Sequence, residues 1–146
     1  IAALGEQMLK VTAALADGTL TWCTGPQTLA NHTIPTLKAA ADKAGRDSTR
    51  VIAALPVCVT NDREAALQRA AQVFVVYGQL PSYRAMLDKE GAAGPADIAI
   101  IGNASEVADR IMALAEIGVT DFAAVEFGAT PDEVAETRAM VKSLLK

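Results

Sequence analysis

The chain has 146 residues, of which 51% are hydrophobic and 4% aromatic, and its formal net charge is -4. A chain of this length can bury a core as one domain, and this composition is typical of a helix-rich α/β protein rather than a disordered one. The acidic balance and the scattered Lys and Arg residues argue against a nucleic-acid partner. No apolar run approaches the roughly 20 residues of a membrane span. Because no signal-peptide pattern opens the chain, we expect a cytoplasmic protein that does not bind membranes.

The first part of the chain alternates short apolar segments with amphipathic helices. An apolar stub at residues 1–4 precedes a helix predicted over residues 6–16. The β-branched and aromatic residues of 19–23 predict a strand. A second helix follows over residues 25–44, in which Pro35 either introduces a kink or marks the true start.

The middle of the chain contains the longest predicted strand, at residues 50–60. It is apolar almost throughout, which indicates a strand of a parallel sheet with both faces covered. Asn61 and Glu64 form a capping pair at the start of a third helix. Residues 77–95 are rich in Gly and Pro around a helical piece at 82–89. They interrupt the alternation of strands and helices, so we interpret them as an insertion, here called the excursion.

The last part of the chain contains two clear helix starts. A short extended run at residues 97–101 precedes Asn103 and Glu106, which are spaced as a capping box. Residues 121–127 form the last predicted strand. Residues 130–133 combine a Thr cap, a Pro at the first helical position and a Glu three residues after the cap, so they predict the start of the final helix.

These elements predict a single α/β domain over residues 1–146. Four principal parallel strands, near residues 1–4, 19–23, 51–59 and 122–127, are each followed by a helix, with the helices on one side. This is half of an eightfold (β/α)8 barrel. An open doubly wound sheet is the alternative, although the two glycine-rich phosphate loops that are typical of such sheets are absent from the sequence.

Gly5 lies where the first apolar segment meets the first helix. Free backbone N–H groups at a helix start favour anions, so this junction is a candidate phosphate site. From the residues alone, Gly5 is more simply explained as the glycine that allows a tight strand-to-helix turn. Glu6 argues against an anion because it adds a negative charge to the first turn.

Other candidates lie where a barrel would have its mouth. Trp22, Thr24 and Gly25 follow a predicted strand, and Tyr83 lies in the excursion, where it could line a substrate wall. Core packing is the simpler explanation of Trp22, and surface packing of a long connection explains Tyr83 equally well. His32, the only histidine, has no evident partner and is interpreted as a surface residue. No set of side chains has the spacing of a metal site or of an acid–base carboxylate pair.

Several motifs, taken in order, resemble the luciferase-like monooxygenase superfamily, and in particular its deazaflavin-dependent members. The resemblance covers nearly the whole chain, and its main pieces are residues 2–9, 16–20, 44–46, 81–84 and 101–107. It implies the carboxy-terminal half of a TIM-like barrel with an insertion.

The resemblance also implies a cofactor and its phosphate site. Leu4, Gly5 and Met8 would bind the phosphate of coenzyme F420, a deazaflavin used for hydride transfer, and residues 22–25 would lie at the mouth. The alternative within the superfamily is an FMN-dependent monooxygenase. Glu6 departs from the family pattern, which often has Pro at this position.

The family's first barrel half, which carries much of the ring contact and the catalytic residues, has no counterpart in the chain. We therefore expect an oxidoreductase of a small-molecule substrate that is inactive as this chain alone. We also expect a homo-oligomer, or association with the missing half-barrel, that covers inner-face residues including Trp22, Val51 and Val57. A noncatalytic half-barrel that serves as an assembly module is the other hypothesis.

Overall fold

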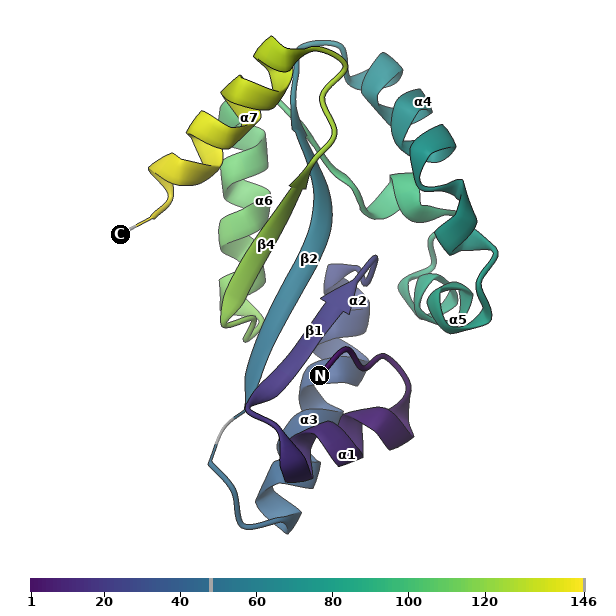
Figure 1. The fold of residues 1–146 in the computed structure, drawn as a ribbon, viewed down its shortest axis with the longest axis vertical. Helices are drawn as coiled ribbons and strands as arrows, with labels where there is room; N and C mark the ends of the chain where they lie inside the picture. Colours follow the sequence, from purple (N-terminus) through teal and green to yellow (C-terminus); the bar gives the residue numbers. More distant parts are fainter. Residues whose placement is uncertain (48, 146) are drawn as a thin grey trace.

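A parallel sheet lies at the centre of the chain, with helices packed behind it (Figure 1). The computed structural model describes residues 1–47 and 49–145. The strands are β1 (Gly18–Trp22), β2 (Arg50–Val59), β3 (Ile100–Gly102) and β4 (Asp121–Glu126).

The strand register defines the two edges of the sheet. β1 pairs with residues 50–54 of β2, β3 with residues 57–59, and β4 with residues 52–57. Since β4 overlaps both of the other pairings, β1 and β3 share one edge of β2 and β4 occupies the opposite edge. All of these pairings are parallel, as the sequence predicted.

The helices follow the strands in the expected alternation. They are α1 (Glu6–Leu15), α2 (Pro26–Thr28), α3 (Ile34–Lys43), α4 (Arg63–Val73), α5 (Pro81–Glu90), α6 (Ala104–Glu116) and α7 (Pro131–Ser143), with the π-helix η1 (Leu29–Thr33) and the 3-10 helices η2 (Val75–Gly78) and η3 (Pro95–Ile98). In Figure 1, α3 and α6 lie behind the sheet, while α4 and α5 flank its right-hand side. The excursion expected at residues 77–95 contains α5 and follows α4 in the chain, before β3.

The two faces of the sheet have different surroundings, because successive strand residues point to opposite sides. Val51 and Val57 lie on the helix side in the main core cluster, at 3% and 0% exposure. Their expected place on the inner face is therefore wrong. The opposite face is less covered and includes Leu20, Ile52, Ala123 and Val125, which we call the open sheet face.

The strand expected at residues 1–4 is reduced to a single bridge, between Ala2 and Leu20. The reason is that the Thr19 hydroxyl accepts a hydrogen bond from the Ala3 N–H at 3.2 Å and donates to the Ala3 carbonyl at 3.1 Å. The Thr19 side chain thus bonds to the N–H and C=O groups of Ala3, which would pair with a neighbouring strand in a regular parallel ladder. The sheet's additional strand is instead β3, which begins three residues later than the extended run predicted at 97–101, because η3 occupies the start of that run.

Capping residues determine where several helices begin. The prediction that Asn61 caps the third helix is wrong, because Asp62 occupies that position and its carboxylate accepts the Ala65 N–H at 3.0 Å. The Asn103 and Thr130 caps are confirmed. These bonds satisfy N–H groups that have no partner within the first helical turn.

Pro35 breaks the long helix expected over residues 25–44 into three consecutive segments. The π-helix η1 precedes α3, which begins at Ile34. Because Pro has no N–H and its ring clashes with the carbonyl four residues earlier, a regular α-helical path through this position is disfavoured. The resulting π-bulge carries His32.

Candidate functional site

A cleft of about 570 Å³ lies between the start of α1, strand β1 and helix α5. It brings together five residues that the sequence had placed in two separate groups, the phosphate junction and the barrel mouth: Leu4, Gly5, Met8, Trp22 and Tyr83. Ala2, Ala3, Leu20 and Ser82 complete its lining. The walls are therefore mainly apolar and aromatic, with a helix start at one side.

The start of α1 is open. Gly5 is its N-cap, at φ -75° and ψ 151°, and no side chain of the described residues caps it. A Cβ at Gly5 would meet no atom within 4 Å, so the space in front of this helix is free. The first intrahelical bond runs from the Leu9 N–H to the Gly5 carbonyl, which leaves the preceding N–H groups available to an anion.

The helix starts that follow the other strands already have an acceptor. The Glu90 carboxylate accepts the N–H groups of Gln27 and Thr28, at 3.1 and 2.7 Å, at the start of α2. Asp62, Asn103 and Thr130 cap α4, α6 and α7. Among these strand-to-helix junctions, the one at Gly5 is therefore the junction that could receive an external anion without displacing a side chain.

Cationic side chains offset the unexpected Glu6 beside this junction. Lys10 Nζ lies 2.6 Å from the Glu6 carboxylate, and this contact lowers the pKa of Glu6, with smaller contributions from the charges of His32 and Lys89. Both members of the pair are exposed, so the pairing is easily rearranged. The charge of Glu6 thus does not exclude an anion from the start of α1.

The turn after β1 orients Trp22 toward the cleft. Cys23 has φ +49°, a left-handed conformation that is uncommon outside glycine and that marks a constrained turn. Thr24 is buried, and its hydroxyl donates to the Trp22 carbonyl at 3.3 Å. Gly25 lies against the Glu90 carboxylate, where a Cβ would come within 2.2 Å of the carboxyl carbon. Thr24 and Gly25 therefore lie outside the cleft lining and support the turn.

Aromatic side chains gather at the carboxyl ends of the strands. The ring of Trp22 makes edge contacts with Phe74 and Tyr77, at 5.7 and 5.5 Å between centroids. Tyr77 in turn contacts Tyr83 at 5.1 Å, and Phe74 contacts Phe127 at 5.5 Å. Five of the chain's six aromatic residues thus form one cluster. Two of them, Trp22 and Tyr83, line the cleft, where their rings suit an apolar or planar ligand.

The cysteines near this cluster are buried thiols without a disulfide. Burial raises the pKa of Cys23 to about 12, and burial also raises the pKa of Cys58 despite its contact with Arg69. Both thiols stay protonated near neutral pH, and a protonated thiol is a poor nucleophile. They serve as small apolar side chains of the core.

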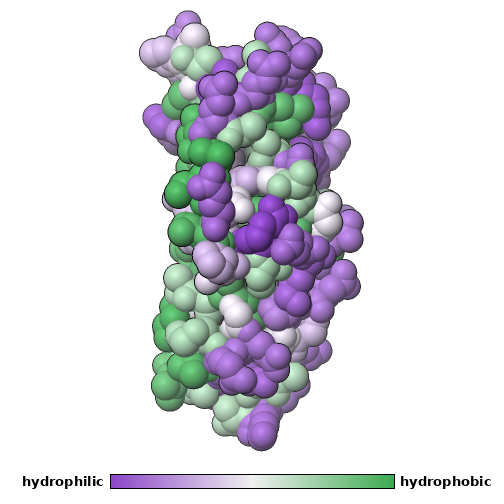
Figure 2. Space-filling view, turned by 90° about the vertical axis from the view of Figure 1, so that its right-hand side faces the viewer, coloured by the Kyte–Doolittle hydropathy of each residue, from purple (hydrophilic) through white to green (hydrophobic). Residues whose placement is uncertain are grey.

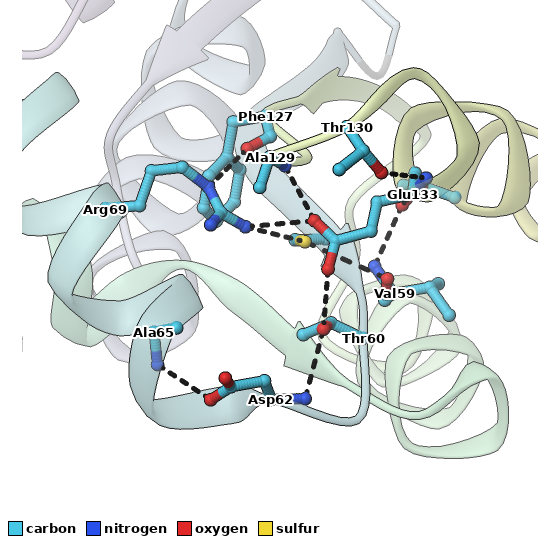
Figure 3. Close-up of polar contacts among 11 residues, drawn as sticks. Val59, Thr60, Asp62, Ala65, Arg69, Phe127, Ala129, Thr130 and Glu133 are labelled. Carbon is cyan, nitrogen blue, oxygen red and sulfur yellow. Dashed lines mark hydrogen bonds and ion pairs between the residues drawn. The ribbon is translucent and has the colours of Figure 1, made fainter.

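A polar network joins α4 to the loop after β4 (Figure 3). The guanidinium of Arg69 donates to the Phe127 carbonyl at 3.0 Å and to the Glu133 carboxylate at 3.2 Å. Glu133 also accepts the Thr60 hydroxyl at 2.9 Å and the Ala129 N–H at 2.6 Å. An internal carboxylate thus occupies the start of α7, and it binds the same Arg69 guanidinium that holds the Phe127 carbonyl.

We expect Glu133→Gln to lower the free energy of unfolding by about 2 kcal/mol, since it removes a charge-assisted acceptor of three donors. Arg69 and Glu133 are 23% and 26% exposed, which leaves the pair only modestly screened. Urea unfolding measures the change. Glu136→Gln, an exposed position on the same helix, is the control and should change stability by less than about 0.5 kcal/mol. Equal effects of the two variants would contradict the structural role of the network.

No three His, Cys, Asp or Glu side chains of residues 1–47 and 49–145 lie together as a metal site requires. In the same residues, no helix is long and apolar enough to cross a bilayer.

Sequence reasoning missed three residues around the cleft and the aromatic cluster. His32 Nε2 lies 3.1 Å from the Leu4 carbonyl oxygen. The Glu90 carboxylate accepts backbone N–H groups at the start of α2, and Arg69 donates to a backbone carbonyl in the loop after β4. Their partners lie 28, 62 and 58 residues away in the chain. The Pro35 bulge was the one local signal, because π-bulges are frequent at functional sites.

Comparison with known proteins identifies the family. The profile of the luciferase-like monooxygenase family matches residues 1–137. The chain belongs to this family. The resemblance inferred from the sequence motifs is therefore confirmed, whereas a search of curated proteins gives no match.

Solved structures share the fold of this luciferase-like chain. An F420-dependent secondary alcohol dehydrogenase in complex with an F420-acetone adduct aligns with a TM-score of 0.78 at 18% identity, over 99% of this chain and 48% of that protein. The coenzyme F420-dependent tetrahydromethanopterin reductase of Methanopyrus kandleri aligns with a TM-score of 0.73 at 22% identity, over 96% and 47%.

A flavin enzyme has the same fold. The oxygenating constituent of 3,6-diketocamphane monooxygenase from Pseudomonas putida, in complex with FMN, aligns with a TM-score of 0.62 at 14% identity, over 91% of this chain and 43% of that protein. The chain thus spans about half the length of these proteins. The predicted α/β half-barrel with parallel strands is confirmed.

Proposed function

We propose that this chain forms the cofactor-phosphate side of a luciferase-like oxidoreductase barrel and that its cofactor is the deazaflavin coenzyme F420. The observation that carries the proposal is the open start of α1 at Gly5, which faces a cleft with aromatic walls. Leu4, Gly5 and Met8 would hold the phosphate, with the backbone N–H groups of the first turn as donors. The cofactor, when bound, supplies the hydride donor or acceptor.

The cleft fits such a group in charge and in shape. The start of α1 has unpaired donors and free space for a phosphate, and the wall beside it is formed by Leu20, Trp22 and Tyr83. Apolar and aromatic surfaces of this kind favour a planar ring or an apolar substrate. Thr24 and Gly25 would act indirectly, because they hold the turn that positions Trp22.

The chain's own cleft residues bind and orient, but they offer little for proton transfer. Its described lining contains no carboxylate and no imidazole, and the one phenol, Tyr83, has a pKa raised by burial and by Tyr77. We therefore assign no catalytic residue and expect this chain to be inactive by itself. The groups that act on a small-molecule substrate would come from the other half of the barrel.

FMN is the second candidate cofactor, since one structure of this fold holds FMN. Both cofactors carry a phosphate, so the same junction would serve either. An FMN-dependent monooxygenase would then be the function.

A titration with FMN, riboflavin and F420, monitored by tryptophan fluorescence, tests the proposal. Trp22 reports on binding because it is the only tryptophan and lines the cleft. We expect FMN to bind at least about tenfold more tightly than riboflavin, because riboflavin lacks the phosphate and its contacts. A tenfold difference in affinity corresponds to about 1.4 kcal/mol. Tighter binding of F420 than of FMN would favour the deazaflavin. Equal affinities for FMN and riboflavin would contradict the phosphate site.

A further inference from the structure

The single histidine contacts the backbone of the candidate phosphate site. His32 belongs to the π-helix η1, and its Nε2 lies 3.1 Å from the carbonyl oxygen of Leu4, the residue before the α1 cap. The contact is partly buried. Because a carbonyl oxygen only accepts, Nε2 must carry the proton and donate it.

This hydrogen bond orients the peptide group that opens the site. The peptide bond between Leu4 and Gly5 is trans, so the Gly5 N–H points in the opposite direction to the Leu4 C=O. When His32 holds the Leu4 carbonyl toward η1, the Gly5 N–H must point the other way. The bond also ties the start of α1 to the helical segment that continues into Pro35, although no side chain of residues 1–47 and 49–145 caps α1.

The π-bulge explains why the imidazole reaches this carbonyl. A π-helical turn inserts one additional residue per turn and rotates the side chains relative to a regular α-helix. Pro35 disfavours the α-helical path at this point. His32 therefore reaches across to a junction that lies 28 residues earlier in the chain.

We propose that His32 is a positioning residue that holds the Leu4–Gly5 peptide in the orientation needed to bind the cofactor's phosphate. The inference rests on the proposed function, and it adds a residue that itself does not line the cleft. His32 acts through the backbone of Leu4 and has no direct contact with the ligand in this assignment. Its imidazole contributes a hydrogen-bond donor at one fixed position.

Three substitutions distinguish the loss of the His32 hydrogen-bond donor from the effect of merely changing a side chain in η1. His32→Gln keeps an amide donor at a similar reach, whereas His32→Leu removes the donor and keeps an apolar side chain. Asn31→Ala changes the exposed neighbour in the same π-helix and is the control. Each variant is titrated with FMN and with riboflavin, and the amide hydrogen exchange of residues 5–9 is measured without ligand.

We expect His32→Leu to weaken FMN binding about fivefold and to leave riboflavin binding unchanged, as the loss of one neutral hydrogen bond predicts. The Leu9 amide, which bonds to the Gly5 carbonyl, should exchange about fivefold faster in this variant. His32→Gln and Asn31→Ala should both stay within about twofold of the original chain in affinity and exchange.

The outcomes distinguish this inference from the proposed function. If the original chain prefers FMN to riboflavin but His32→Leu binds FMN equally well, the phosphate site stands and the role of His32 is wrong. If FMN and riboflavin bind the original chain equally, the phosphate site fails, and the positioning role toward that site fails with it, whatever the exchange rates show. An equal loss in His32→Gln and His32→Leu would overturn the donor role.

Discussion

Gly5→Asp is expected to weaken the binding of FMN and of coenzyme F420 by at least about tenfold, which corresponds to about 1.4 kcal/mol. Gly5 is the N-cap of α1 and has free space in front of it. An aspartate there would accept the first-turn N–H groups that a phosphate would otherwise use. Its carboxylate would also repel the phosphate.

The expected loss of affinity should come without a loss of stability. Aspartate is a better N-cap than glycine by a few tenths of a kcal/mol, and its negative charge complements the helix dipole. The thermal midpoint of Gly5→Asp should therefore stay equal or rise slightly while the affinity falls. A parallel decrease of stability and affinity would instead indicate general disruption.

Gly5→Ala is the matched control for this experiment. The Gly5 backbone angles are accessible to any residue, and an added Cβ meets no atom within 4 Å. Alanine adds only a methyl group to that space and accepts none of the first-turn N–H groups, so it should weaken the affinity clearly less than Gly5→Asp does. Fluorescence titration of both variants measures the difference, and an unchanged affinity in Gly5→Asp would show that the phosphate lies elsewhere.

Local patterns predicted much of the fold. The caps at Asn103 and Thr130 lie beside the N–H groups they bond, so a few consecutive residues contain the whole signal. The apolar run of β2 and its parallel pairing followed from burial on both faces. The resemblance of the motifs added the half-barrel arrangement, which periodicity alone left open against a doubly wound sheet.

The errors arose where a side chain competes with the backbone or where two caps are possible. Thr19 binds both polar groups of Ala3 and so reduces the first strand to one bridge. Asp62 displaces Asn61 as the cap of α4, a shift of one position that local pattern does not decide. The face to which Val51 and Val57 point depends on register, because a shift of one residue reverses every side chain of a strand.

The candidate site could be predicted only in part. Leu4, Gly5 and Met8 are close together in the sequence, and the structure places Trp22 and Tyr83 in the same cleft. His32 and Glu90 could not be found in this way, because each meets backbone groups far away in the chain. Such contacts depend on the packing of α5 and the π-bulge, which no local spacing encodes.

The open sheet face, formed by Leu20, Ile52, Ala123 and Val125, is expected to make this 146-residue chain self-associate. Leu20 and Val125 are 42% and 38% exposed. Figure 2 shows hydrophobic residues along its left-hand edge, the side that faces the viewer in Figure 1. Within the described residues β4 pairs only with β2, so its outer edge keeps unpaired N–H and C=O groups.

A single charge on this face should therefore shift the chain toward the monomer. Leu20→Lys places an ammonium group in the apolar contact, where its desolvation is costly, and we expect at least about tenfold weaker association, or about 1.4 kcal/mol. Met112→Lys is the control, since Met112 has a similar exposure of 45% but lies on α6, on the helix side. Sedimentation velocity over a range of concentrations measures both variants. A wild-type chain that stays a stable monomer at all concentrations would contradict self-association through the open sheet face. Equal weakening of association by Met112→Lys would show that the contact lies elsewhere.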